Sequence, residues 1–265
     1  MRGRRGWQVT GTLSLAFVLV FGAVQTWAMV VQQKTVSERT YQVPVTRVEL
    51  DTGTAAVVIR PGAPGRVHVK QYLDWTVRKP TVSAVFEGDA LTVRMRCNQV
   101  LPAVDVGCAA LIELEVPVAT SVSGGGTSGS IEVQDLTGSI RLAATSGAIQ
   151  LVGLSGEVSA RTTSGLLRAS GLTSARVEAR SFSGEVDLGF VRAPHLVDVG
   201  VSSGAVSLGL PPGSRYAFDF SGGAVGGERH VDPELADASS PDTVRVGTTS
   251  GSVRVVSGAA DRGPS

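Results

Sequence analysis

The sequence predicts an all-β protein in which an N-terminal transmembrane helix is followed by a β-sandwich-like cap that leads into a β-solenoid with Ser-Gly corners. Three observations support this prediction: a long uncharged apolar segment near the N-terminus, apolar residues that alternate with polar ones from residue 43 onward, and a Thr-Ser-Gly triplet that recurs every 18 residues. Strict alternation is typical of strands with one buried face. A constant period of this length is typical of stacked repeats.

The first 31 residues predict a membrane anchor. No charged residue occurs between residues 6 and 33, and residues 13–31 are mostly apolar. A helix of about 20 residues spans the roughly 30 Å hydrocarbon layer of a bilayer. Arg2, Arg4 and Arg5 precede the segment, and Lys/Arg-rich flanks stay in the cytoplasm. We therefore expect a cytoplasmic N-terminus at 1–11, a single-pass anchor at 12–31 in contact with the lipid bilayer of the cell membrane, and an extracytoplasmic remainder.

A cleavable signal peptide is the alternative for the same segment. Its uninterrupted apolar core, residues 15–24, is short, and Thr26-Trp27-Ala28 loosely matches a small-x-small cleavage site. Under both interpretations the rest of the chain works outside the cytoplasm, tethered if the anchor is retained and secreted if it is removed.

Residues 32–42 predict a polar linker, and residues 43–120 predict a cap of several short antiparallel strands. Apolar residues in the cap alternate, as at Val57 and Ile59, and turn residues separate the runs. Both cysteines of the chain, Cys97 and Cys108, fall here. Because disulfides form in oxidising compartments, we expect these two thiols to be bonded to each other. Two thiols without further ligands do not make a metal site.

An internal repeat determines the prediction for residues 121–256. Each 18-residue period carries two strands and two corners, and each Gly is followed by a short strand whose second and fourth residues are apolar. Equivalent residues of stacked coils lie about 4.8 Å apart, and glycine supplies corner conformations that other residues resist. The triplets are Thr127-Ser128-Gly129, Thr145-Ser146-Gly147 and Thr163-Ser164-Gly165, and the expected interior rows are Ile131, Ile149 and Leu167 in one and Leu136, Leu154 and Leu172 in the other.

The repeat is less regular toward the C-terminus. Gly is missing at Ser174, a longer connection occupies residues 189–196, and a polar loop at 226–243 precedes one final strand at 243–256. Residues 257–265 predict a disordered tail.

The Arg-rich start with a single anchor, the alternating segment with Cys97 and Cys108, and the tandem Thr-Ser-Gly-x-apolar-x-apolar repeats resemble a bacterial β-strand-repeat family of unknown function labelled putative adhesin. The resemblance covers about residues 43–256. The 3 Lys against 21 Arg resemble an actinobacterial version. The resemblance implies an architecture and an adhesive surface role, but the family has no agreed activity or catalytic residues to carry over.

Two outward rows are the candidate binding residues, because alternate side chains of a strand point to opposite faces. Glu132, Gln150 and Arg168 should stack on one outer face of successive coils, and Arg141 with Ser159 on another. Such rows can bind a glycan or a partner protein, although a solvated face explains them as well.

The sequence predicts a surface structural or adhesive module without catalysis, cofactor or metal. Its three histidines, His68, His195 and His230, are isolated from one another, and no cluster of acids resembles a polysaccharide-cleaving site. The net charge of +1 argues against nucleic acid. The expected partner is an envelope glycan or another surface protein. The alternatives are a cell-envelope enzyme that acts on polysaccharide and an envelope sensing component, for which residues 1–11 are too short to be an effector domain.

Overall fold

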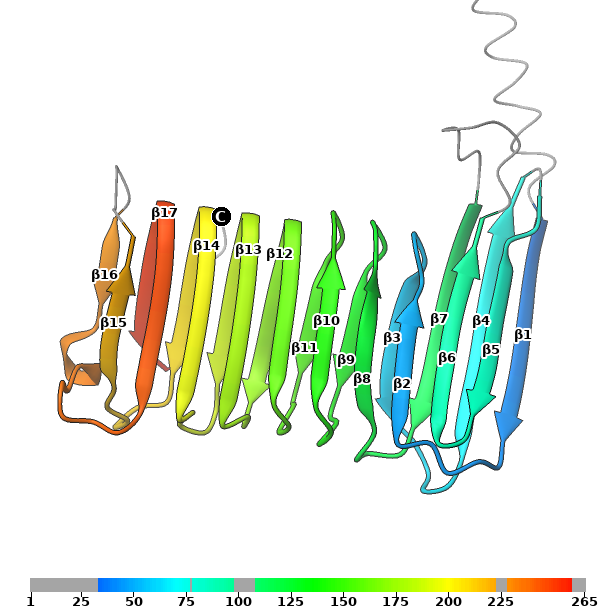
Figure 1. Cartoon of the computed structure of the whole chain (residues 1–265), viewed down its shortest axis with the longest axis horizontal. Helices are drawn as coiled ribbons and strands as arrows, with labels where there is room; N and C mark the ends of the chain where they lie inside the picture. The colour runs from blue at the N-terminus through cyan, green and yellow to red at the C-terminus, as the bar shows by residue number, and fades with distance from the viewer. Residues whose placement is uncertain (1–32, 77, 98–107, 223–227, 259–265) are drawn as a thin grey trace, which may run out of the picture.

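The computed structural model describes residues 33–76, 78–97, 108–222 and 228–258. The strands stand side by side along one long axis (Figure 1), and the described part contains one short 3-10 helix, η1 (Pro233–Leu235). The strands are β1 (Gln33–Tyr41), β2 (Arg47–Asp51), β3 (Ala56–Pro61), β4 (Val67–Trp75), β5 (Thr81–Glu87), β6 (Ala90–Arg96), β7 (Cys108–Val116), β8 (Ser121–Gly126), β9 (Ile131–Gln134), β10 (Ile140–Ala144), β11 (Ile149–Val152), β12 (Val158–Leu172), β13 (Arg176–Phe190), β14 (Leu196–Leu210), β15 (Ala217–Ser221), β16 (Arg229–Val231) and β17 (Thr243–Ser257).

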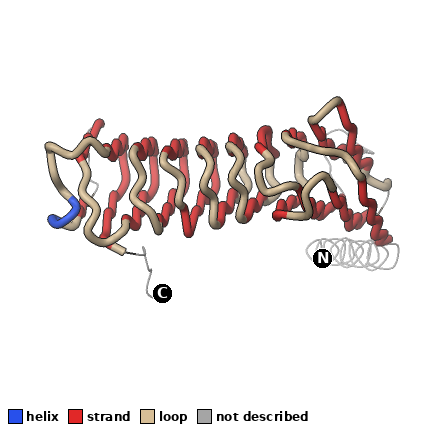
Figure 2. The backbone as a smooth tube through the Cα atoms, turned by 90° about the horizontal axis from the view of Figure 1, so that it is seen from below, coloured by secondary structure: helices blue, strands red, loops and turns tan. Residues whose placement is uncertain are grey.

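The strands form two faces around a common apolar core (Figure 2). Each long strand turns at a Ser-Gly corner, such as Ser164-Gly165 in β12, and contributes its first half to one face and its second half to the other. Face A contains β5, β6, β2, β8, β10, the first halves of β12, β13, β14 and β17, and β15. Face B contains β1, β4, β7, β3, β9, β11, the second halves of β12, β13, β14 and β17, and β16.

The parallel register confirms the predicted coil. Ile149 pairs with Ile131 on one side and with Leu167 on the other, and all three side chains are fully buried. The second predicted row is also buried: Leu136, Leu154 and Leu172 each have 0% exposure. The backbone N–H of Ser155 donates to the carbonyl of Leu136 at 3.2 Å, and this hydrogen bond joins the equivalent corners of two adjacent coils.

The number of residues per coil increases where the sequence repeat is irregular. Ile140 pairs with Val158, 18 residues later, whereas Val158 pairs with Val177 and Val177 with Val197. The connection between β12 and β13 and the longer connection between β13 and β14 hold the added residues. The core row continues through these coils because the insertions lie at corners.

The stack of coils begins inside the segment that was predicted as a separate antiparallel cap. β2 and β3 pair in parallel with β8 and β9 on one side and with β6 and β7 on the other. Antiparallel pairing in this region joins β4 to β7 and β5 to β6. The predicted linker is also a strand: β1 pairs antiparallel with β4 along its whole length. No break in the sheets marks residue 120, because the first coil of the chain presents the same two strands and corner as the later repeats.

Chain order and spatial order differ at both ends of the stack. The first coil, β2 and β3, lies between two later ones, and β17 lies between β14 and the pair β15 and β16. At the first end, Tyr41 of β1 meets Phe86 of β5 with ring centroids 4.7 Å apart. At the other end the guanidinium of Arg229 lies 4.3 Å from the ring of Phe220. Aromatic side chains thus cover the core where the stack of coils ends.

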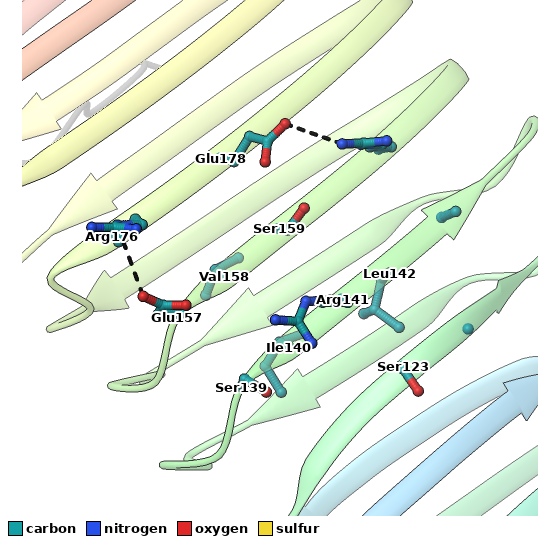
Figure 3. A pocket seen from close by; sticks show the side chains of 13 residues that line it. Ser123, Ser139, Ile140, Arg141, Leu142, Glu157, Val158, Ser159, Arg176 and Glu178 are labelled. Atoms are coloured by element: carbon teal, nitrogen blue, oxygen red, sulfur yellow. Dashed lines mark hydrogen bonds and ion pairs between the residues drawn. The ribbon is translucent and has the colours of Figure 1, made fainter.

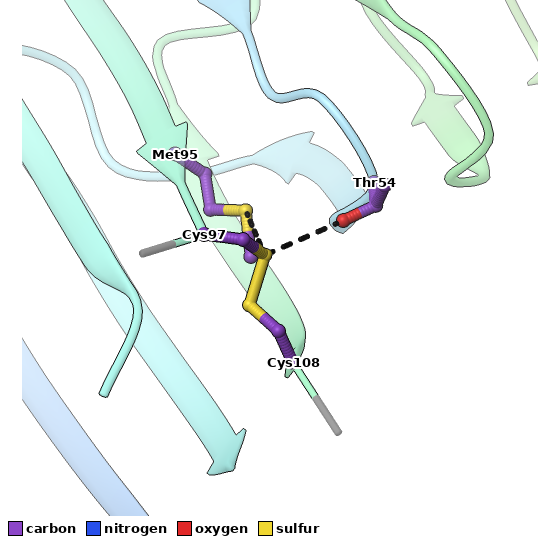
Figure 4. Close-up of a disulfide and its surroundings, with 4 residues drawn as sticks. All are labelled: Thr54, Met95, Cys97 and Cys108. Carbon is purple, nitrogen blue, oxygen red and sulfur yellow. Dashed lines mark hydrogen bonds between the residues drawn. A yellow bond between two sulfur atoms is a disulfide. The ribbon is translucent and has the colours of Figure 1, made fainter. Parts of the chain in front are cut away.

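The predicted disulfide is present. Cys97 follows β6 on face A and Cys108 begins β7 on face B, so the bond links the two faces. Figure 4 shows it beside Met95 and Thr54. The intervening residues 98–107 lie outside the described part.

The sequence predicted that corner glycines adopt a backbone conformation other residues resist, and Gly184, Gly204 and Gly251 of the later coils do have a positive φ. The glycines of the three Thr-Ser-Gly triplets are required for a different reason. Gly129, Gly147 and Gly165 are not in the left-handed region. Instead, a Cβ at Gly147 would lie 2.0 Å from the carbonyl oxygen of Gly129, and a Cβ at Gly165 would lie 2.1 Å from that of Gly147. The coils touch backbone to backbone at this corner, and only glycine fits.

No helix in the described ranges is both long and apolar enough to cross a bilayer. The predicted anchor at 12–31 lies outside these ranges. Residues 259–265 of the predicted tail also lie outside them. Residues 257 and 258 are described, and Ser257 ends β17.

Candidate binding groove

The five candidate binding residues lie on two separate faces. Gln150 pairs with Glu132 and with Arg168 on face B, and Arg141 pairs with Ser159 on face A. The register therefore places each predicted row as expected, but it does not bring the two rows together.

The face B row is largely occupied by its own contacts. It continues from Arg168 to Asp187, and Arg168 Nε lies 3.5 Å from Asp187 Oδ2. Partial burial raises the pKa of the Asp187 carboxyl, and the nearby charge of Arg168 opposes that rise. Glu132 accepts a hydrogen bond from Gln134. This row offers few free polar groups to a ligand.

The face A row borders a groove that crosses strands β8, β10, β12 and β13. The groove has a volume of about 630 Å³, and Figure 3 shows the side chains that border it. Its polar lining consists of three serines, Ser123, Ser139 and Ser159, and five charged residues, Arg141, Glu157, Arg161, Arg176 and Glu178.

Ion pairs fix most of the charged wall. Arg161 Nη2 lies 3.2 Å from Glu178 Oε1, and Arg176 Nε lies 3.8 Å from Glu157 Oε1. These side chains are half or more exposed except for Glu178, so each pair contributes little to stability. Their effect is to hold both carboxylates of the groove against arginines.

A bidentate pair continues this wall beyond the groove. Arg180 donates from Nη1 and Nη2 to the two carboxylate oxygens of Asp198 at 2.7 and 2.8 Å. These hydrogen bonds lower the pKa of Asp198 and raise that of Arg180. A planar guanidinium matches a carboxylate in this geometry, so Arg180 is held in one orientation.

Arg141 differs from the arginines beside it. It is exposed on β10 between Ser123 and Ser159, and within the described residues no carboxylate oxygen lies within 4.0 Å of its guanidinium. Its five N–H donors are directed to an open groove with serine hydroxyls on both neighbouring strands. Arg141 is thus the cation of this groove that can take an anion from solution.

A second hollow lies beyond Arg161 and is bordered by an exposed aromatic ring. Arg161 lines both the groove around Arg141 and this second hollow, of about 550 Å³, which Arg180 and Phe182 border. The Phe182 side chain is 66% exposed. Sequence reasoning missed this residue, although the signal was present: Phe182 stands where earlier triplets have Thr145 and Thr163.

Comparison with known proteins assigns the fold. The family model described as Toastrack DUF4097 matches residues 112–255. The chain belongs to this family. No curated protein sequence matches it.

Two solved structures resemble this Toastrack chain. A putative adhesin from Bacteroides fragilis is 13% identical with a TM-score of 0.51, and the match covers 84% of this chain and 98% of that one. A putative adhesin from Parabacteroides distasonis is 14% identical with a TM-score of 0.50, covering 84% and 97%. At these identities the likeness supports the fold alone. The family resemblance predicted from the repeats is confirmed.

The Toastrack match begins within β7 and ends within β17. It therefore contains the whole groove and Phe182. Within the described ranges no group of three or more His, Cys, Asp or Glu side chains could hold a metal ion.

Proposed function

We propose that this Toastrack chain is a membrane-anchored, extracytoplasmic binding module of the adhesin type that captures an envelope glycan in the face A groove without acting on it chemically. The single observation that carries the proposal is the groove itself: an open groove across the strands of face A, bordered by serines and by paired charges, with one arginine, Arg141, that has no carboxylate partner among the described residues. Serine hydroxyls and arginine are suited to the hydroxyls and acidic groups of sugars.

Three further observations support the location and the class of function. The Cys97–Cys108 disulfide is typical of an oxidising compartment, and the Arg-rich start before an apolar segment favours export of the residues after that segment. The solved structures with this fold are named as putative adhesins, a name that describes those proteins and supports the same role here.

The geometry favours binding over glycoside hydrolysis. Hydrolysis requires a proton-donating acid and a second carboxylate that is free to attack or to activate water. Glu157 and Glu178 are the two carboxylates that line the groove, and each contacts an arginine. This arrangement supports a fixed ionic wall as their role.

A glycan array that is scored for both retention and cleavage tests the function. The full chain in detergent micelles should be retained on a subset of glycans, and no new reducing ends should appear in the supernatant. Release of reducing ends that depends on Glu157 or Glu178 would contradict the non-catalytic role. Absence of retention on every glycan would contradict the glycan-binding role.

Protease added to intact cells tests the location. A C-terminally tagged chain should be degraded from outside while it stays in the membrane fraction, and its intact mass should include the N-terminal residues. Protection of the tag in intact cells would contradict export. A mature protein that begins at Met29 would show that the anchor is removed.

A further inference from the structure

Phe182 is an aromatic residue that the fold itself does not need. It occupies the corner position between Ser181 and Ser183, which stack on Thr162 and Ser164 of the preceding coil. The equivalent residue of that coil is Thr163, and Thr249 occupies the same corner position of β17. With 66% of its side chain exposed, Phe182 gains little from packing. An exposed ring at a corner where the repeat uses small hydroxyl residues is therefore explained better by contact with something outside the chain.

Phe182 and Arg141 border two neighbouring hollows, one on either side of Arg161. The hollow around Arg141 and the hollow around Phe182 share Arg161 as a lining residue. Arg141 lies on β10 and Phe182 on β13, with β12 between them. The path from Arg141 at one end to Phe182 at the other therefore runs along the ion-paired wall, past the Arg161–Glu178 pair.

The distance between the two ends sets the size of the ligand. Two strand steps of about 4.8 Å separate β10 from β13 across the sheet, and four residues of about 3.3 Å separate the two positions along the strands. Together these give about 16 Å, which is the length of a short oligosaccharide. A single sugar or a lone carboxylate would not reach both ends.

The two ends differ in the chemistry that they favour. A guanidinium without a carboxylate partner binds a carboxylate in a bidentate manner. The face of an exposed aromatic ring is apolar and carries partial negative charge, so the C–H face of a sugar ring packs on it. Neutral glycans satisfy only the second end, and small anions satisfy only the first.

We infer that the groove takes an acidic oligosaccharide, with a uronate carboxylate on Arg141 and the face of a second sugar ring on Phe182. This inference rests on the proposed function, since it names the class of glycan that the groove would capture. The ligand lies diagonally across β10, β12 and β13 and passes Arg161. The seryl hydroxyls of Ser123 and Ser159 flank the carboxylate site.

Binding of tetragalacturonate to the full chain in detergent micelles, measured by calorimetry, tests this inference. The matched neutral ligand is the fully methyl-esterified tetramer, which has the same rings without the charge. The acid should bind at least about tenfold more tightly than the ester, and added salt should reduce the difference. Equal binding of acid and ester would overturn the assignment of Arg141 while leaving glycan binding intact.

Two variants and two matched controls locate the ligand. Arg141→Gln should weaken binding of the acid about tenfold and leave the ester unchanged. Phe182→Thr, which restores the residue found in other repeats, should weaken both ligands about threefold or more. The controls are Arg254→Gln on face B and Val191→Thr, whose side chain is 66% exposed like that of Phe182. Both controls should bind as the unmodified chain does.

The failures of the two proposals can be told apart. If Arg254→Gln weakens the acid as much as Arg141→Gln, the attraction is a general charge effect and the inferred site is wrong. If a glycerol phosphate oligomer binds more tightly than tetragalacturonate, the carboxylate assignment is wrong. If no glycan of any class is retained on the array, the proposed function itself is wrong.

Discussion

Replacing a single corner glycine should destabilise the solenoid strongly, although the change adds only one methyl group. In Gly147→Ala the new Cβ would lie 2.0 Å from the carbonyl oxygen of Gly129. The carbonyl must move by about 1 Å to reach even 3.0 Å, the shortest separation that real Cβ atoms show. The carbonyl of Gly147 in turn lies 2.1 Å from the Cβ position of Gly165, so a shift in one coil disturbs the next.

The expected cost comes from overpacking in a closely packed structure. Such insertions typically cost 1–3 kcal/mol and sometimes more, and we expect about 3 kcal/mol because backbone, and not a flexible side chain, must move. For a chain of this size that corresponds to a fall in Tm of roughly 6–12 °C. Thermal unfolding of the full chain in detergent micelles, followed by far-ultraviolet circular dichroism, measures it.

Gly189→Ala is the matched control. Its new Cβ would meet the nearest atom, the carbonyl oxygen of Ala169, at 3.7 Å, which is an ordinary contact. Its Tm should stay the same or rise slightly, because alanine restricts the unfolded chain. A Gly147→Ala protein that melts within about 2 °C of the unmodified chain would refute backbone contact as the reason for glycine at this corner.

Three other perturbations concern the packing, the disulfide and the ion pairs. Ile149→Ala should lower the free energy of unfolding by about 2–5 kcal/mol in denaturant titrations, because it removes a fully buried side chain from the interior row. Gln150→Ala, at an exposed position, should change that free energy by less than about 0.5 kcal/mol. Equal effects of the two variants would contradict the assignment of these side chains to the inner and outer faces. The Cys97→Ser/Cys108→Ser double variant should lose about 2–3 kcal/mol, and the unmodified chain should lose as much when reductant is added; insensitivity to reductant would argue against the bond. Hydrogen bonds from its arginine partner lower the pKa of Asp198. The ionised carboxylate should therefore stabilise the folded chain at neutral pH, and this stabilisation should disappear as the pH falls through the lowered pKa. Asp198→Asn should therefore have a lower Tm than the unmodified chain at pH 7, and the two Tm values should converge in strong acid. A difference in Tm that does not change with pH would contradict this direction of pH dependence.

The coil could be predicted because its signal is local and periodic. Side chains alternate along a strand, so the nine-residue half-period places Ile131, Ile149 and Leu167 above one another without knowledge of any distant contact. The disulfide could be predicted because the chain has two cysteines and an Arg-flanked apolar segment that predicts export. The outer rows on the two faces are a consequence of the same alternation.

The spatial order of the strands at the two ends of the stack could not be predicted from the sequence. Nothing local indicates that β2 and β3 insert between β6–β7 and β8–β9, or that β17 inserts before β15 and β16. Parallel coils with equal patterns can stack in several orders. The order is decided by which backbone edges meet, and that is a property of the folded chain.

The residues of the groove show the same division between local and tertiary information. Alternation alone determined that Arg141 and Ser159 point outward on one face. Only the tertiary structure decided that Arg161, Arg176 and Arg180 are held by carboxylates of adjacent coils while Arg141 is not, because such pairs join residues 17 to 19 positions apart. Likewise, the sequence determined where the corner glycines fall, and the tertiary structure supplied their reason, since the carbonyl that leaves no room for a Cβ belongs to the neighbouring coil.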